Sequence, residues 1–301
     1  LIFGGESVVQ GAITIARKMN VSPLLIGFTI VAVGTSLPEL AVAINAVSSN
    51  SQELVDLAVG GVLGSNVANV MLVLGTAAML GACDKPGIEI KKDAIAVIMA
   101  SIILLLTVMR GEITQIVGIL MIIALITYYV YSYNYSKKLG LDEELEETWM
   151  GENFLLAMII TILGGAMIVL GAELLIEGSV GIADSFGISE SIVGLSVIAL
   201  GTSLPELAVT MIAALRGHKG VAIGNVLGSN VINILGILGI SSAYAGGILV
   251  SEEFAGRDIW VVLVTSGLIA AMLLNERKIT KTLGAVMVIG YLSYMTLLYT
   301  I

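Results

Sequence analysis

The 301-residue chain has few of the residues on which most enzymes rely for nucleophilic or metal chemistry. It contains one cysteine, Cys83, and one histidine, His218, which lies in the polar connection RGHKG. A single cysteine excludes an internal disulfide and a thiolate metal cluster. A single histidine in a solvated connection argues against a zinc, copper or iron site, because such sites need several nitrogen or sulfur ligands. We therefore expect no cofactor.

Charged residues are scarce as well. Asp, Glu, Lys and Arg make up 12% of the chain and hydrophobic residues 57%, with a mean hydropathy of +1.02. Soluble domains carry about 25% charged residues, so this composition indicates an integral membrane protein that is embedded in the lipid bilayer. Much of the net charge of −9 lies in one acidic segment at 142–147, and the chain has no basic surface for nucleic acid. Nothing in the sequence indicates an obligate protein partner.

Apolar segments long enough to cross a bilayer as helices fill almost the whole chain. They predict an all-α membrane protein with ten transmembrane helices. The ten segments lie near 1–16, 23–47, 54–80, 94–109, 113–135, 153–183, 191–215, 220–247, 259–274 and 282–301. Gly, Ser and Pro are frequent in helices 2, 3, 7 and 8, so we expect these four to be interrupted. The first helix is shorter than its counterpart in the second half, which indicates that it is truncated.

The two halves of the sequence are duplicates. GTSLPELAV at 34–42 returns at 201–209, and GGVLGSNVANV at 60–70 corresponds to GNVLGSNVINI at 224–234. Similarity of this kind identifies two structural repeats. Each repeat contains five segments, an odd number, so the second repeat must enter the membrane in the opposite direction from the first. The repeats are therefore expected to be inverted.

The duplication divides the chain into a first half at 1–135, an acidic linker at 136–152 and a second half at 153–301. Of the 14 lysines and arginines, only Arg110 and Arg257 fall on one side of the membrane in this arrangement. Basic residues concentrate on the cytoplasmic side of membrane proteins. We therefore expect a multi-pass protein of the cell membrane with both termini outside and the acidic linker in the cytoplasm.

Each copy of GTSLPEL places a proline and a carboxylate inside a transmembrane segment. Pro38 and Pro205 cannot donate a backbone hydrogen bond, so each frees a carbonyl one turn earlier in its helix. The oxygen-bearing side chains beside them are Thr35, Ser36 and Glu39 in the first copy and Thr202, Ser203 and Glu206 in the second. Carboxylate, hydroxyl and carbonyl oxygens suit Na+, Ca2+ or Mg2+. Neither segment contains a lysine or arginine to pair with its carboxylate, so a cation must come from outside the chain.

The second repeated motif adds Ser65 with Asn69 and Ser229 with Asn233, each pair four residues apart and on one helix face. Inverted symmetry then predicts one central site, in which two glutamates face each other within a ring of Thr, Ser and Asn oxygens. Their two negative charges match one Ca2+. Proline kinks and small-residue motifs also serve helix packing alone, but packing does not require two glutamates in the membrane.

At these residues the sequence resembles the cation/calcium antiporter superfamily, and specifically the prokaryotic sodium/calcium exchanger family, whose repeats carry GTSLPE and GNxxGSNxxN patterns. The resemblance covers essentially the whole chain. It implies an antiporter, not an enzyme, that exchanges Ca2+ for Na+ by alternating access. In the family the first and sixth helices are thought to slide across the rest as the gate.

The resemblance also implies roles for individual residues. Glu39 and Glu206 would be ligands shared by Ca2+ and Na+, and Asn69 and Asn233 would complete the central site. The flanking Na+ sites would use Ala32, Thr35, Ser36 and Ser65 on one side and Ala199, Thr202, Ser203 and Ser229 on the other. One departure from the family pattern is Gly61, which stands where the second copy has Asn225. Two central amides, rather than an amide and an acid, favour exchange that is independent of K+.

Two other functions fit the same residues. An H+/Ca2+ antiporter could use the paired glutamates as proton carriers, and Ca2+ flux driven by a pH gradient without Na+ would favour it. A cation channel could also use broken helices and carboxylates, and Ca2+ flux that needs no ion on the opposite side would select it. An intramembrane protease is disfavoured, because the sequence offers no catalytic aspartate pair, serine–histidine pair or HExxH motif.

Overall fold

A computed structural model of the chain describes residues 1–49, 51–83, 90–140, 148–151, 153–185, 201 and 203–300. Most of these residues are helical. In the order of the chain, with η for a π-helical segment, the elements are α1 (Ile2–Met19), α2 (Pro23–Ile26), η1 (Gly27–Val31), α3 (Ala32–Thr35), α4 (Leu37–Ser48), α5 (Gln52–Ala68), η2 (Asn69–Val73), α6 (Leu74–Met79), α7 (Ile90–Arg110), β1 (Glu112–Thr114), α8 (Gln115–Leu139), α9 (Phe154–Ser185), α12 (Leu204–Leu215), α13 (Lys219–Val231), η4 (Ile232–Leu238), α14 (Gly239–Ala245), β2 (Gly247–Leu249), α15 (Glu252–Gly256), α16 (Asp258–Leu274) and α17 (Lys281–Thr300).

Helices of membrane-spanning length dominate the described chain. Those long and apolar enough to cross a bilayer are Gln52–Met79, Ile90–Arg110, Gln115–Leu139, Phe154–Gly178 and Lys219–Ala245. A sixth span results if Pro23–Thr35 and Leu37–Ser48 are counted together. The chain therefore has the architecture of a multi-pass membrane protein, as its composition predicts. Leu204–Leu215, Asp258–Leu274 and Lys281–Leu297 are shorter apolar helices.

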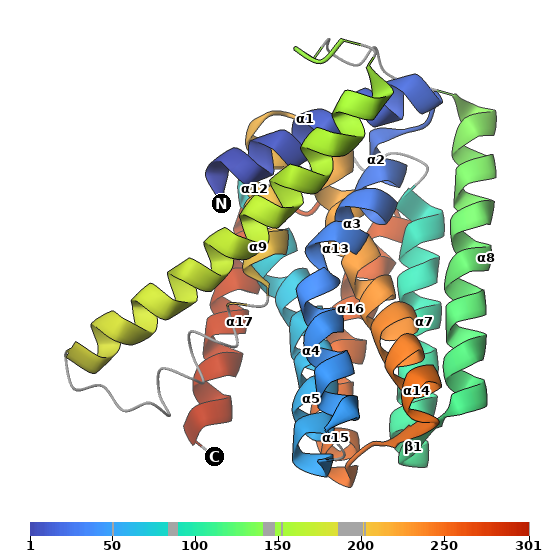
Figure 1. Cartoon of the computed structure of the whole chain (residues 1–301), viewed down its shortest axis with the longest axis vertical. Helices are drawn as coiled ribbons and strands as arrows, with labels where there is room; N and C mark the ends of the chain where they lie inside the picture. Colours follow the sequence, from blue (N-terminus) through green and yellow to red (C-terminus); the bar gives the residue numbers. More distant parts are fainter. Residues whose placement is uncertain are drawn as a thin grey trace.

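The helix formed by α13, η4 and α14 is the central element of the molecule. Its apolar window is entirely buried, whereas only 17% of the corresponding window of α8 is buried. Figure 1 shows α8 along one edge of the molecule, with α1 and α9 packed against each other on the other side. Small residues let a membrane helix approach its neighbours closely on every side, and this helix carries the glycines of the second GSN motif.

The predicted interruption of helices 3 and 8 is corrected by the structure. Residues 52–79 run without a break through α5, η2 and α6, and residues 219–245 run likewise through α13, η4 and α14. Neither stretch contains proline, so every amide keeps its hydrogen-bond donor and the helix continues. Each contains a π-helical segment instead, and Asn69 and Asn233 both lie in one. Such segments occur often at functional sites.

Other boundaries differ slightly from those expected. Helix α8 continues to Leu139, so the helix extends into the range assigned to the linker, and the acidic residues 142–147 lie outside the described part of the chain. The strands β1 and β2 were not predicted. They form an antiparallel pair with Ile113 opposite Ile248, which joins the connection after α7 to the connection after α14. Three-residue strands carry too little sequence pattern to be recognised.

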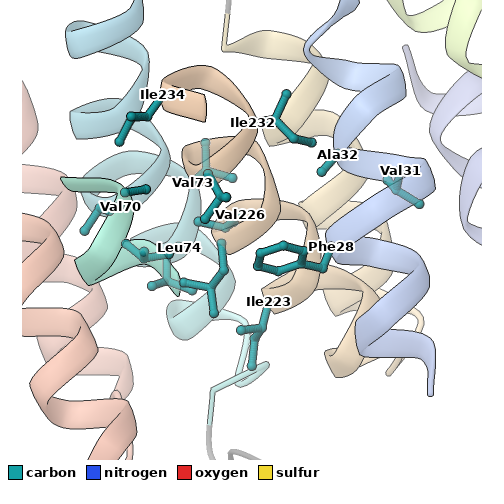
Figure 2. Close-up of a cluster of buried hydrophobic side chains, with 14 of the residues drawn as sticks. Phe28, Val31, Ala32, Val70, Val73, Leu74, Ile223, Val226, Ile232 and Ile234 are labelled. Carbon is teal, nitrogen blue, oxygen red and sulfur yellow. The ribbon is translucent and has the colours of Figure 1, made fainter. Parts of the chain in front are cut away.

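Apolar side chains hold the central helix to the helices on either side of it. Figure 2 shows Ile223 and Val226 of α13 with Phe28 on one side and with Val73 and Leu74 on the other. All five are buried. Phe28 comes from the first half of the chain just before GTSLPEL, and Val73 and Leu74 follow the first GSN motif. This core therefore brings the segments that carry the repeated motifs into one region.

Candidate cation site

The first copy of GTSLPEL breaks its helix at Ser36. Helix α3 ends at Thr35 and α4 begins at Leu37, with a bend of 45° between the two parts. Pro38 therefore lies in the first turn of a new helix, where its missing N–H is not needed. The backbone at Ser36 has φ −91° and ψ 5°. At Ser203, the corresponding residue before α12, φ is −93° and ψ is 1°.

This break gives each motif a specific electrostatic character. In the first copy the carbonyl of Gly34 has no ordinary helical partner, because Pro38 lacks an N–H, and the end of α3 carries the partial negative charge of a helix C-terminus. Glu39 and Glu206 lie in the first turns of α4 and α12, where the partial positive charge of a helix N-terminus favours a carboxylate. Both glutamates are buried, with 6% and 0% of their surfaces exposed. They are close enough to repel each other.

Oxygen-bearing groups of the first half lie beside oxygens of the second half. Ser36 Oγ donates a hydrogen bond to Glu206 Oε1 at 3.2 Å. Thr35 Oγ1 lies 3.2 Å from the carbonyl oxygen of Ala32 and 3.5 Å from Ser229 Oγ. Ala32, Thr35 and Ser36 therefore meet Ser229 and Glu206 in one cluster of oxygens. All five residues are buried.

Two glycines of α13 allow this close approach. A Cβ atom at Gly224 would lie 2.3 Å from the carbonyl oxygen of Leu24, and one at Gly228 would lie 2.3 Å from that of Phe28. Any side chain at either position would collide with the backbone of the first half. The glycines of GNVLGSN thus let α13 lie directly against η1 and bring Ser229 to Thr35.

This packing corrects the expected grouping of the hydroxyls. Ser65 was expected beside Thr35, but it accepts a hydrogen bond from Asn233 Nδ2 at 3.1 Å. Ser229 takes the expected place of Ser65, because the helix that packs on η1 and α3 comes from the second half. Thr202 and Ala199, which were predicted for the second flanking site, lie outside the described residues.

Several oxygens of the site have no hydrogen-bond partner. In the part of the chain that the structure describes, these buried atoms include Glu39 Oε1 and Oε2, Glu206 Oε2, Ser203 Oγ, Asn69 Oδ1 and Asn233 Oδ1. A buried polar group left without a partner costs about 1–3 kcal/mol. Such a concentration of unpartnered oxygens calls for a positive ligand. Among the described residues no lysine or arginine forms an ion pair with either glutamate.

The donor set indicates which kind of ligand these oxygens could hold. It consists of carboxylate, hydroxyl, amide and carbonyl oxygens, which bind hard cations such as Na+ and Ca2+. The described residues contain no group of three or more His, Cys, Asp and Glu side chains that could hold a metal ion. The arrangement therefore fits a site in which two carboxylates supply the charge and neutral oxygens complete the shell.

Two neighbours of the site were not among the predicted ligands. Asn225 Nδ2 donates to Thr210 Oγ1 at 3.0 Å and to the main-chain oxygen of Glu206 at 3.4 Å. Asn225 Oδ1 accepts from Thr35 Oγ1 at 3.3 Å. The only signal in the sequence was the mismatch between Asn225 and Gly61, because Thr210 looks like an ordinary helix residue.

Comparisons with known proteins show which family the chain is similar to. Residues 1–134 and 156–300 match the family model described as sodium/calcium exchanger protein. The chain is 34% identical to the putative antiporter CaxA of Alkalimonas amylolytica, over 100% of this chain and 95% of that protein. It is 29% identical to the sodium/calcium exchanger MaX1 of Methanosarcina acetivorans, over 100% and 96%. The solved sodium/calcium exchanger from Methanococcus jannaschii is 28% identical, with a TM-score of 0.83 over 98% of this chain and 93% of that one.

Proposed function

Because the chain belongs to the sodium/calcium exchanger family, we propose that it is a secondary-active antiporter that exchanges Ca2+ for Na+ across the cell membrane by alternating access. Membership in this family confirms the assignment made from the repeated motifs. The family consists of exchangers, which are not enzymes. The observation that carries the proposal is the set of buried, unpartnered oxygens around Glu39 and Glu206. Hard cations transported by this protein would satisfy them.

Competition between the two ions is the basis of exchange in this proposal. Glu39 and Glu206 together carry two negative charges, which balance one Ca2+ at the centre with Asn69 and Asn233 as neutral ligands. Na+ would use the cluster of Ala32, Thr35, Ser36, Ser229 and Glu206, with a related site around Ser65, Ser203 and the residues 199 and 202. Since every site draws on the same carboxylates, Ca2+ and Na+ cannot all be bound at once.

The transport cycle follows from the cost of the empty site. Two buried carboxylates without a counter-charge repel each other and have lost their hydration, so the ion-free protein pays a large penalty in any closed intermediate. A bound Ca2+ or a set of Na+ ions removes this penalty, and the loaded protein can then change between inward-open and outward-open states. The cycle therefore couples the two ions without any chemical step.

The proposed architecture is two inverted five-helix repeats, at 1–135 and 153–301, joined by a cytoplasmic linker with both termini outside. The nearly equal dihedral angles of Ser36 and Ser203 support the repeat, because equivalent residues of two copies should break their helices in the same way. We further propose α1 and α9 as the moving gate. A Cβ at Gly4 would lie 2.7 Å from the carbonyl oxygen of Gly164, and a Cβ at Gly164 would lie 2.7 Å from the carbonyl oxygen of Gly4. The two helices are therefore in backbone contact.

An H+/Ca2+ antiporter is the second candidate. Two neighbouring buried carboxylates can carry protons as well as Na+, and the relative from Alkalimonas amylolytica is named only as a putative antiporter. A cation channel is a weaker candidate, because nothing in its function requires a site in which two ions exclude each other.

Uptake of Ca2+ into proteoliposomes separates these functions. Vesicles that contain the purified protein would be loaded with Na+ or with K+, and a third set would carry an acidic interior without Na+. The membrane potential would be clamped in all three. Uptake only from Na+-loaded vesicles is the expected result. Uptake driven by internal acid would establish the proton antiporter, and equal uptake in all three sets would establish a channel.

A further inference from the structure

Asn225 links three helices beside the cluster around Glu206. Its side chain is fully buried and lies on α13, one turn before Ser229. The amide nitrogen is fixed by Thr210 at 3.0 Å and by the main-chain oxygen of Glu206 at 3.4 Å, both on α12. These two bonds orient the amide so that its oxygen points to Thr35 on α3, at 3.3 Å. Asn225 thus connects one oxygen ligand, Thr35, to the backbone of another, Glu206.

The first repeat lacks both members of this arrangement. Gly61 occupies the position of Asn225, and Ala43 occupies the position of Thr210. Both losses concern the same hydrogen bond, since Thr210 holds the amide group of Asn225. Replacement of the pair, rather than of one residue, indicates that the two residues act together. The two halves of the chain therefore support their oxygen clusters differently.

The acceptor that the Thr35 hydroxyl uses decides which oxygens are free to bind a cation. The hydroxyl has one hydrogen, and its acceptors include the Ala32 carbonyl at 3.2 Å and Asn225 Oδ1 at 3.3 Å. The Ala32 oxygen already accepts the backbone N–H of Ser36 at 3.1 Å. A carbonyl has two lone pairs, so a second bond from Thr35 would leave none for an ion.

Asn225 offers the hydrogen of Thr35 a different acceptor. When Thr35 donates to Asn225, the Ala32 oxygen keeps one lone pair free. The oxygen of Thr35 also presents its own lone pairs away from Asn225. Both oxygens then become available to the same cation. Outer groups that orient metal ligands in this way typically change metal affinity by about 10- to 100-fold when they are removed.

We infer that Asn225, held in place by Thr210, is a positioning residue for the Na+ site formed by Ala32, Thr35, Ser36, Ser229 and Glu206, and that the two flanking Na+ sites consequently differ in affinity. This inference rests on the proposed function. The stronger flanking site is the one that contains Ser229. Ca2+ at the centre depends mainly on the two carboxylates, so its affinity does not depend on Asn225 to the same extent.

Two substitutions test the inference with residues that the chain itself uses in its other half. Asn225→Gly and Thr210→Ala copy Gly61 and Ala43, and Thr210→Ser is the matched control because it keeps the hydroxyl. We expect the Na+ concentration for half-maximal exchange to rise by about tenfold in the first two variants and to stay unchanged in the control. Ca2+/Ca2+ exchange in the absence of Na+ should keep its half-saturating Ca2+ concentration in all three.

An unchanged Na+ dependence in Thr210→Ala and Asn225→Gly would overturn the inference. A parallel loss of Na+-driven and Ca2+/Ca2+ exchange would also overturn it, because it would show a structural role only. Na+-dependent thermal stabilisation of the purified protein reads the site without transport. If the wild type showed no Na+-driven exchange, the proposed function would fail, and this second measurement would still decide whether Asn225 and Thr210 support a Na+ site.

Discussion

Replacement of Glu206 by glutamine tests the site most simply, because it removes one charge and almost no volume. Glu206 is fully buried, and Ser36 Oγ is its hydrogen-bond partner at 3.2 Å. Glutamine keeps an oxygen that can accept this bond. The substitution therefore changes the charge available to a bound ion while the packing of α12 against α13 stays the same.

The expected magnitude follows from the burial of the carboxylate. Removing one partner of a buried charge pair costs about 3–5 kcal/mol, which corresponds to a loss of roughly two to four orders of magnitude in Ca2+ affinity. The ion-free protein should respond in the opposite way. It loses the repulsion between Glu206 and Glu39, so its own stability should be maintained or increased.

Thermal unfolding of the purified protein with and without Ca2+ measures both effects. At a Ca2+ concentration 100 times its dissociation constant, the wild type should gain about 2.7 kcal/mol, and a variant bound 100 times more weakly should gain only about 0.4 kcal/mol. Glu53→Gln is the matched control, since Glu53 is exposed at the start of α5. Wild-type stabilisation by Ca2+ in Glu206→Gln, or a less stable ion-free protein, would refute the reasoning.

Three further substitutions test the packing of α13, one neutral ligand and a surface ion pair. Gly228→Ala would place a Cβ 2.3 Å from the Phe28 carbonyl oxygen, so we expect a loss of about 1–3 kcal/mol of stability in denaturant unfolding. The control is Gly267→Ala, because a Cβ at Gly267 would meet open space. Equal losses of stability in the two variants would contradict the packing argument. Ser65→Ala leaves Asn233 without its 3.1 Å partner, so the half-saturating Ca2+ concentration for exchange should rise, and an unchanged value would show that Ser65 does not support Asn233 as a Ca2+ ligand. Arg216→Ala breaks an ion pair of 2.9 Å with Glu6. Because exposed ion pairs contribute little, we expect the stability to change by less than about 1 kcal/mol in thermal unfolding. A larger loss of stability would mean that this pair has a structural role.

The sequence predicted the centre of the site because each motif combines two features that are unusual in a membrane helix. A proline breaks the helix and a carboxylate follows it, and few functions other than ion binding require both inside a membrane. The repeat then indicated that Ser36, Glu206, Ser65 and Asn233 belong to one region. The structure joins them in two pairs, Ser36 with Glu206 and Ser65 with Asn233, by hydrogen bonds between the halves of the chain.

The remaining details depend on packing that a linear pattern does not contain. Whether Ser65 or Ser229 lies beside Thr35 is decided by the helix that packs against η1, and the contact through Gly224 and Gly228 decides it. The continuity of residues 219–245 depends on hydrogen bonds of a π-helical segment, which Gly and Ser content does not reveal. Asn225 appeared only as a mismatch with Gly61, since its role depends on contacts with α3 and α12.

The central claim is that Ca2+ and Na+ compete for one site built by both halves of the chain. Equilibrium binding of radioactive Ca2+ to the purified protein, repeated at increasing Na+ concentrations, tests it most directly. The account predicts that Na+ raises the apparent dissociation constant for Ca2+ without lowering the number of ions bound at saturation. It would be contradicted if Na+ left Ca2+ binding unchanged, or if Na+ lowered the saturating amount while the dissociation constant stayed the same.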